Sequence, residues 1–575
     1  MKLLSKAGMA LVLCGLALLI LLLNINHYSL TEKSVRTTIE DSSQANALLN
    51  ASKSLLNKKY NSKFSFAKAL NVSITKANEA LESSGDSTAT EEDTKDTAEQ
   101  KNESDSTDMV AGKETNNSSA IDTSGAGKNN LNADNGDAQA NNAEENATES
   151  IDTDIITLLV KNSTEGPLEK HNSLFLWLTI GLFSGGSILF SLATYFSKPP
   201  GISNNNVFKK SISSKGVVAV IVGIGLIAFY CVLYWYPYLL ADLIKLVDPL
   251  SYGMSGYGAD DGFLYGTIYS LAVLLLGIKM FLKYRHSTYQ KIRTLSVTFF
   301  QLSFAFIIPE ILRALKKPAL DLKNIWPLDY SFFWNENFSE LLQNGKLGIF
   351  MLVWGIVLLI IIVPLFTYFF GKRWYCSWVC GCGGLAETAG DPFRQLSSKK
   401  LVAWKIERIL IYSILVIITL ITAITLVNYF SNGKLLGSAT EITQQWYGFL
   451  IGSVFAGVIG TGLYPFMGSR VWCRFGCPLS AIFGIIQRYK SRFRITTNGG
   501  QCISCGNCST YCEMGIDVRS YAQKGQNIVR ASCVGCGICA EVCPRGVLKL
   551  ENGKTEGRIN NDPIIIGNNS IKVNL

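Results

Sequence analysis

The sequence predicts an α-helical integral membrane protein of about eight spans that ends in a small, cysteine-rich α+β domain. Only 17% of the 575 residues are charged, below the roughly 25% of soluble domains, and 48% are hydrophobic. Several stretches are apolar for about 20 residues, the length that crosses a hydrocarbon layer of roughly 30 Å. Of 15 cysteines, all but Cys14 and Cys231 lie between 376 and 543.

The spans are expected near 7–25, 174–196, 216–236, 263–282, 295–313, 347–370, 409–430 and 446–466. The first has the basic start and apolar run of a signal peptide. Its run is long and no small-x-small cleavage site follows, so an uncleaved anchor over 1–25 is favoured. Spans two to six then fill 173–370, and spans seven and eight lie within 409–489.

Lysine and arginine fix the expected orientation. They concentrate before the first span, between spans two and three, between four and five, and in the loop 371–408. The positive-inside rule makes these segments cytoplasmic. Both chain ends are then expected on the cytoplasmic side of a bacterial inner membrane. The net charge of +9 therefore reflects topology, and no nucleic-acid partner is needed to explain it.

Residues 26–172 form the expected outer segment. Helical periodicity marks its first part, but from about 75 the composition becomes Ser, Thr, Asn, Asp, Glu and Gly with almost no aromatic residues. Such a composition cannot bury enough apolar surface to offset chain entropy, so disorder is predicted. The tail 551–575 shows no motif that assigns it a role.

Two cysteine runs near the C-terminus carry the strongest signal. "QCISCGNCSTYC" from Gln501 and "SCVGCGICAEVC" from Ser532 repeat the spacing C-x₂-C-x₂-C-x₃-C. This run is typical of bacterial two-cluster ferredoxins, in which the last cysteine of each run ligates the other [4Fe–4S] cluster. Zinc also accepts four cysteines but does not explain two copies of this run.

Residues 490–550 are therefore predicted to be a ferredoxin-like α+β domain that holds two [4Fe–4S] clusters. One expected ligand set is Cys502, Cys505, Cys508 and Cys543, and the other is Cys533, Cys536, Cys539 and Cys512. Pro544 follows the last cysteine, as the pattern expects, but Glu513 replaces the equivalent proline after the first run.

Five more cysteines follow spans six and eight on the inner side of the membrane. "YCSWVCGCGG" contains Cys376, Cys380 and Cys382, and "VWCRFGCPLS" contains Cys473 and Cys477. Neighbouring Lys and Arg residues favour the thiolate form. Neighbouring spans can bring the pairs together as an additional metal site or a reversible dithiol. Reduced cysteines that merely pack at helix ends are the alternative.

The two C-x₃-C motifs after spans, followed by a two-cluster module, resemble the NosR/NapH-type membrane polyferredoxins. The resemblance covers about 347–550. It implies quinol-linked or flavin-linked electron transfer to a periplasmic reductase, or support for its metal centres. Cys382 stands where the family has proline. The nearest match to a covalent-flavin motif, "TSGAGK" at Thr123, lacks the terminal threonine, so no covalent flavin is expected.

The sequence offers no protein-bound group that would carry electrons across the membrane. None of the three histidines lies in a span, which excludes a pair of intramembrane haem ligands. A quinone, a soluble redox partner or a flavoprotein subunit is the expected partner, beside membrane lipid. Glu310 and Arg313, at one end of a span, are read either as a structural ion pair or as a quinone or proton site.

Three functions fit these motifs. The first is a membrane-bound iron–sulfur electron-transfer protein between a quinone pool or cytoplasmic donor and a periplasmic reductase system. The second is a metal-centre assembly or metal-reduction factor, and the third, weaker, is a redox-sensing regulator. With no hydrolytic triad, phosphate loop or nucleotide fingerprint in the sequence, a relay subunit is favoured over a stand-alone enzyme.

Overall fold

The computed structural model describes residues 2–39, 41–86, 155–197, 200–201, 215–317, 322–323, 325–431, 438–552, 564–566 and 571–573. These residues form two compact units. The larger contains 1–21, 172–236 and 246–575, and the smaller contains 22–171 and 237–245. Each unit is described by itself.

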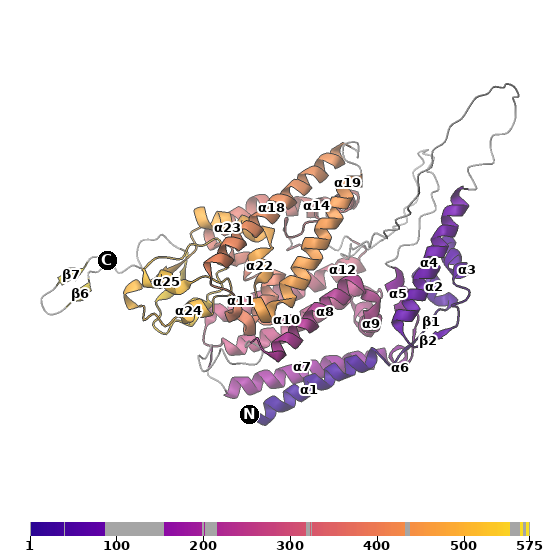
Figure 1. The fold of residues 1–575 in the computed structure, drawn as a ribbon, viewed down its shortest axis with the longest axis horizontal. Coiled ribbons are helices and arrows are strands. Elements are labelled where there is room, and N and C mark those ends of the chain that lie inside the picture. The colour runs from indigo at the N-terminus through magenta and orange to yellow at the C-terminus, as the bar shows by residue number, and fades with distance from the viewer. Residues whose placement is uncertain are drawn as a thin grey trace, which may run out of the picture. The chain divides into compact units, whose positions relative to one another are not determined.

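Among the described residues, seven helical stretches are long and apolar enough to cross a membrane (Figure 1). They are α1 (Lys2–Leu22), α7 (Asn172–Ser197), α8 (Val217–Trp235), α10 (Asp261–Lys283), the stretch Thr288–Ala314, the stretch Gly345–Phe370, and α18 (Leu401–Phe430). All seven correspond to predicted spans. The longest extend six to eight residues beyond the predicted inner ends, because polar turns continue the helix.

Two of these stretches contain a π-helical turn. Thr288–Ala314 comprises α11 (Thr288–Leu302), η3 (Ser303–Ile307) and α12 (Ile308–Ala314), and Gly345–Phe370 comprises α14 (Gly345–Val357), η4 (Leu358–Ile362) and α15 (Val363–Phe370). The eighth predicted span is also helical, formed by α19 (Ser438–Tyr447), η6 (Gly448–Ile459) and α20 (Gly460–Gly462). Glycines lower its hydropathy, and it is not among the seven. π-turns are frequent at functional sites.

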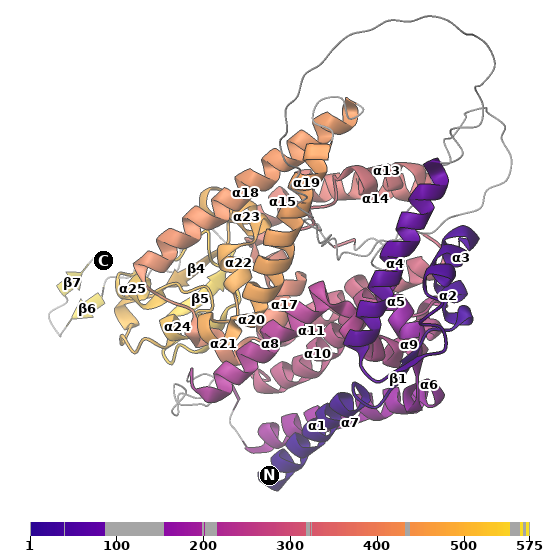
Figure 2. The same ribbon diagram turned by 45° about the vertical axis from the view of Figure 1, so that its right-hand side comes forward.

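Helix α1 lies alongside α7 in both views (Figures 1 and 2). Their backbones meet at two glycines: a Cβ on Gly8 would lie 2.7 Å from the carbonyl oxygen of Gly186, and one on Gly186 would lie 2.8 Å from that of Gly8. Small residues that let two backbones approach closely are typical of helix pairs in membranes.

Short helices form the two segments that carry Cys376, Cys380, Cys382, Cys473 and Cys477. They are α16 (Arg373–Cys376), α17 (Gly381–Thr388), η5 (Asp391–Leu396), α21 (Tyr464–Met467), α22 (Val471–Phe475) and α23 (Pro478–Tyr489). Helix α18 runs past α22 and α23 (Figure 2). Two further helices, α9 (Ala241–Ser255) and α13 (Asn335–Gln343), lie in connections between the predicted spans.

The C-terminal module is built around one antiparallel pair. Strand β4 (Arg494–Thr497) pairs with β5 (Leu548–Glu551), with Arg494 opposite Glu551. Between them lie η7 (Gly499–Gln501), α24 (Asn507–Thr510), α25 (Val518–Gln523) and α26 (Ile538–Glu541). The small α+β architecture matches the prediction for 490–550. In the tail, β6 (Ile564–Ile566) pairs with β7 (Ile571–Val573).

The smaller unit departs from the prediction for the outer segment. A three-stranded sheet, ordered β2 (Lys59–Tyr60), β1 (His27–Ser29), β3 (Thr164–Glu165), joins the two ends of the segment. Around it lie α2 (Glu32–Thr38), α3 (Ser42–Ala51), α4 (Lys63–Asp86), α5 (Ile155–Asn162), α6 (Pro167–Lys170) and η2 (Pro237–Leu240).

Disorder from about 75 was wrong for the residues up to 86. Helix α4 continues to Asp86 because Ile74, Ala77 and Leu81 recur at helical spacing and are buried in the core of the smaller unit. The rest of the segment for which disorder was predicted, up to 154, and the "TSGAGK" motif lie outside the described residues.

Candidate functional site

The two cysteine runs of the C-terminal module adopt matching backbone conformations. Gly506 and Gly537 both have φ +79° and ψ −3° and begin α24 and α26. Ser504 and Gly535, two residues earlier, also have positive φ, at +59° and +65°. Left-handed conformations favour glycine. The duplicated sequence therefore folds as a duplicated loop, which turns its cysteines inward around two centres.

The cysteines of the module gather in two crossed sets. Cys502, Cys505, Cys508 and Cys543 line one small cavity of about 20 Å³. Burial, together with the three neighbouring cysteines, raises the pKa of Cys508 to about 11. Thiolates crowded in this way would repel one another unless a metal compensated their charge, which fits a cluster-binding loop.

The second set has the same crossed composition. Burial raises the pKa of Cys539 well above its usual value, and the nearby Cys536, Cys533 and Cys512 add to the effect. The structure thus brings each predicted set together, with the fourth cysteine taken from the other run. Cluster ligation by these residues stays a prediction.

Cys376, Cys380, Cys473 and Cys477, here called the body tetrad, come together from α16, the start of α17, α22 and the start of α23. All four are 7–8% exposed. Each thiol lies within electrostatic reach of the other three. Burial raises the pKa of Cys376 to about 12. Four buried thiols from two segments form a set suited to one tetrahedral metal site or one cubane cluster.

Cys382 is the fifth thiol of this region and lies within electrostatic reach of Cys380, Cys473 and Cys477. A hydrogen bond between the Cys382 and Cys380 thiols lowers the pKa of Cys380 to about 6. The five predicted cysteines therefore lie close together. Cys382 favours the thiolate form of Cys380, which is a candidate ligand, and is not itself counted as a ligand here.

The loop of the body tetrad is folded back along α11. Gln301 Nε2 donates to the carbonyl of Val379 at 2.6 Å, and Tyr269 Oη donates to that of Gly381 at 2.7 Å. Gln301 lies 13 residues from each end of Thr288–Ala314. At 1.5 Å per residue that is about 20 Å, so the loop reaches the middle of this helix.

The C-terminal module contacts the first turn of the same helix. Tyr289 Oη donates to the carbonyl of Gly535 at 2.8 Å, and Gln290 Nε2 donates to that of Cys536 at 2.9 Å. The module and the loop of the body tetrad therefore contact α11 in series, at positions about 18 Å apart by helical rise from Tyr289 to Gln301.

A buried network of charges fills the space between the two cysteine regions. Glu387 accepts from Arg293 at 2.8 Å, from Arg394 at 2.6 Å and from Arg470 at 2.7 Å. Glu513 pairs with Arg394 at 2.8 Å and with Arg470 at 3.3 Å. We call these five residues the arginine–glutamate network.

Two arginines of this network also approach cysteine sulfurs. Arg470 Nη1 lies 3.7 Å from Cys473 Sγ of the body tetrad, and Arg394 Nη1 lies 3.8 Å from Cys536 Sγ of the module. Burial alone would raise the pKa of Glu387, but the three arginines hold it well below its usual range. The network therefore joins the two regions with fixed, ionised groups.

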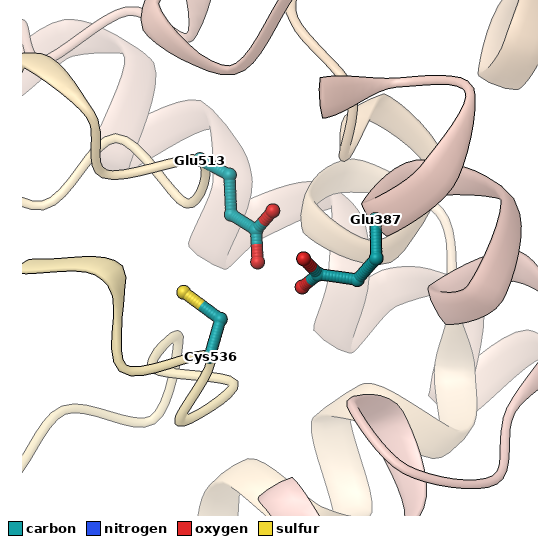
Figure 3. A group of neighbouring side chains, drawn as sticks. All are labelled: Glu387, Glu513 and Cys536. Carbon is teal, nitrogen blue, oxygen red and sulfur yellow. The ribbon is translucent and has the colours of Figure 1, made fainter. Parts of the chain in front are cut away.

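Figure 3 shows the carboxylates of Glu387 and Glu513 turned toward each other, with the Cys536 sulfur nearby. One ligand atom of each lies within 4.8 Å of the others, a spacing that a metal ion could use. Because the arginines already compensate both carboxylates, we interpret the group as part of the network. Glu513 replaces the usual proline because this position faces buried guanidinium groups.

Sequence reasoning missed the residues that join the regions: Arg293, Glu387, Arg394, Gln301 and Tyr269. No local motif contains them, and only the spatial neighbours of the cysteines identify them. Glu310, singled out by its position, lies 3.9 Å from Arg313, which has a closer partner in Asp260 at 3.2 Å. This favours the structural interpretation of that pair.

Comparison with known families assigns the chemistry of both regions. Residues 501–548 match the 4Fe-4S dicluster domain. The segments 352–401 and 448–496, which contain the body tetrad, each match a 4Fe-4S binding domain. The chain thus carries ferredoxin-type iron–sulfur domains. The narrower NosR/NapH resemblance stays a hypothesis that rests on the motifs.

Two curated relatives are similar to part of the chain. One is YccM of Escherichia coli K12, named as an electron transport protein, which is 28% identical over 173 residues. The other is the methylamine utilization ferredoxin-type protein MauN of Methylobacillus flagellatus, 28% identical over 157 residues. Each match covers 26% of this chain, and 44% and 52% of the relatives, about half their length. No solved structure matches.

Proposed function

We propose that this protein is a membrane-embedded iron–sulfur electron relay. Two [4Fe–4S] clusters, bound by the crossed cysteine sets of the C-terminal module, would be joined by a third on the body tetrad. Clusters of this kind carry single electrons. For the site of this third cluster, the sequence predicted only an additional metal site or a reversible dithiol. The names of the two relatives support the same class of function.

The serial arrangement along α11 carries this proposal. In a bilayer, the first turn of α11 would lie at the inner interface with the module, and Gln301 would lie near mid-depth. A cluster on the body tetrad would then shorten the distance that electrons must cross without a bound carrier. A quinone pool or soluble donor inside and a periplasmic reductase system outside remain the proposed partners.

The protein's own residues would prepare the path for the clusters. The arginine–glutamate network links the two cysteine regions through buried ion pairs. Arg470 and Arg394 each direct an N–H group at one ligand sulfur. Hydrogen bonds to cluster sulfurs are among the main determinants of reduction potential.

Iron content distinguishes this relay from a two-cluster protein. Anaerobically purified protein should contain about twelve irons per chain, four for each of three clusters. Cys473→Ser should lose about four irons while the EPR signals of the module persist, and Cys508→Ser should lose about four from the module. Cys231→Ser, outside all motifs, is the control. About eight irons in the wild type, unchanged by Cys473→Ser, would exclude the third cluster.

Cys382 favours one second candidate, a metal-centre assembly factor. A thiol beside a complete tetrad could receive an incoming metal ion, with the module supplying electrons. Cys382→Ala separates the two functions. A relay should keep its iron and its rate of electron transfer to an artificial acceptor, whereas an assembly factor should lose delivery of metal to its client.

A further inference from the structure

A basic cavity of about 210 Å³ lies at the N-terminal end of α18. Its walls come from α18, from α22 and α23, and from the segment 529–532 of the C-terminal module. Cys473 of the body tetrad forms part of the wall. The cavity therefore lies where the helical body and the module meet, within one compact unit.

Four cations line this cavity without a carboxylate partner among the described residues: Lys372, Arg408, Arg488 and Arg530. The ammonium of Lys372 is buried and has one hydrogen-bond partner, Ser480 Oγ at 3.0 Å. The carboxylate on the wall, Glu407, is already occupied by Arg474 at 2.8 Å and by the hydroxyl of Ser532. Lys372 also lies within electrostatic reach of Cys376 and Cys533. The positive charge of Arg408, Arg488 and Arg530 has no such anionic neighbour among the described residues.

One aromatic ring holds two of these cations in place. The Trp404 ring lies 4.5 Å from the guanidinium of Arg530 and 5.3 Å from that of Arg408. Arg408 belongs to α18 and Arg530 to the module. Stacking on an aromatic face orients a guanidinium while leaving its N–H groups free to bind an oxyanion.

The outer surface of α18 beside the cavity is apolar. Ile406, Ile409 and Leu410 are 46%, 67% and 38% exposed, and they belong to a helix long and apolar enough to span a membrane. A ligand in the cavity would therefore have lipid-facing surface next to it. Basic pockets between helices on the cytoplasmic side are typical binding sites for acidic lipid head groups.

We propose that this cavity binds the phosphate of an anionic phospholipid. The phosphate would bridge Arg408 and Arg530 and accept a hydrogen bond from Lys372, and the acyl chains would lie against α18. Bound in this way, the lipid fastens the module to the helical body beside Cys473. Free phosphate offers the same oxyanion, but it makes no use of the apolar surface. The site does not depend on the proposed electron-transfer function.

Native mass spectrometry of the full chain tests this site. The protein is released from nanodiscs of phosphatidylcholine with one-fifth phosphatidylglycerol, and the lipids retained after activation are counted. The wild type should keep one phosphatidylglycerol, and the Arg408→Gln, Arg530→Gln double variant should retain about tenfold less, the loss expected for 1.4 kcal/mol. Lys405→Gln, Lys490→Gln removes two charges from nearby exposed positions outside the cavity and should behave as wild type.

Two outcomes would overturn the proposal. One is equal retention of phosphatidylglycerol by the cavity and control variants, or no preference over phosphatidylcholine. The other is inorganic phosphate that binds to the wild type but not to the double variant and displaces no bound phosphatidylglycerol, which would assign the cavity to a soluble anion. Unchanged iron content and gel-filtration profile in the double variant show that it has folded.

Discussion

The two cysteine regions reach similar ligand sets by different routes. In the C-terminal module, eight cysteines lie within 42 residues, and left-handed residues such as Gly506 and Gly537 shape each loop locally. In the body tetrad, two cysteine pairs almost one hundred residues apart meet only through tertiary packing. Local chain geometry organises the first set, and the surrounding fold organises the second.

This difference predicts where each region is vulnerable. A local loop depends on its own backbone, so substitutions in the helical body should leave it intact. A tetrad assembled from two segments depends on the groups that hold those segments together. The arginine–glutamate network is the clearest such group, since Glu387 belongs to the first segment and Arg470 to the second.

The largest effect is expected for Glu387→Ala. Removing the carboxylate leaves three buried guanidinium groups with too few partners, a change that typically costs about 3–5 kcal/mol. Iron of the body tetrad should be lost while that of the module is retained. Thermal loss of cluster absorbance, with iron analysis, measures this, and Glu441→Ala on the exposed surface of α19 is the control. A destabilisation below about 1 kcal/mol would show that the network does not hold the tetrad.

A smaller effect is expected for Glu513→Pro, which restores the residue usual after such a cysteine run. Here Arg394 and Arg470 keep Glu387 as a partner, and the loss should be about 1–3 kcal/mol, as for a buried hydrogen-bonded group left unpaired. A substitution at the equivalent position after the second run, Pro544→Ala, should be nearly neutral. Equal effects at the two positions would contradict the function assigned to Glu513. Denaturant unfolding of the iron-loaded protein provides the comparison.

The sequence predicted the local region far better than the assembled one. Spacing alone grouped Cys502 with Cys543, and Cys512 with Cys539, because a duplicated run has a known crossed pattern. For Cys376 and Cys473, the sequence predicted only that the two pairs could lie close together. Their depth along α11 depends on Gln301 and Tyr269, polar residues inside apolar helices whose partners are carbonyl groups from a distant loop.

The same reasoning explains the outer segment. Helical spacing of Ile74, Ala77 and Leu81 was present in the sequence, but the polar residues around them dominated the composition. Burial of that stripe in the smaller unit stabilises α4 through tertiary contacts. Composition averages over faces of a helix, so it underestimates order wherever a single face is buried.

The smallest expected effect, Arg470→Lys, tests the comparison at the level of individual sulfurs. Lysine keeps the charge but loses the planar fork that reaches Glu387, the carbonyl of Cys376 and Cys473 Sγ together. Losing the N–H group near the sulfur removes stabilisation from the more negative, reduced state. The reduction potential of the tetrad's cluster should fall by about 60 mV, the one-electron equivalent of about 1.4 kcal/mol.

Arg394→Lys is the matched variant, since Arg394 approaches Cys536 of the module in the same way. If each arginine acts on its nearest sulfur, EPR-monitored redox titration should show one shifted potential per variant, in different clusters. Equal shifts of all clusters in both variants would instead mean that the network acts through its overall charge. The two regions would then be coupled electrostatically as one unit, despite the different routes by which the chain assembles them.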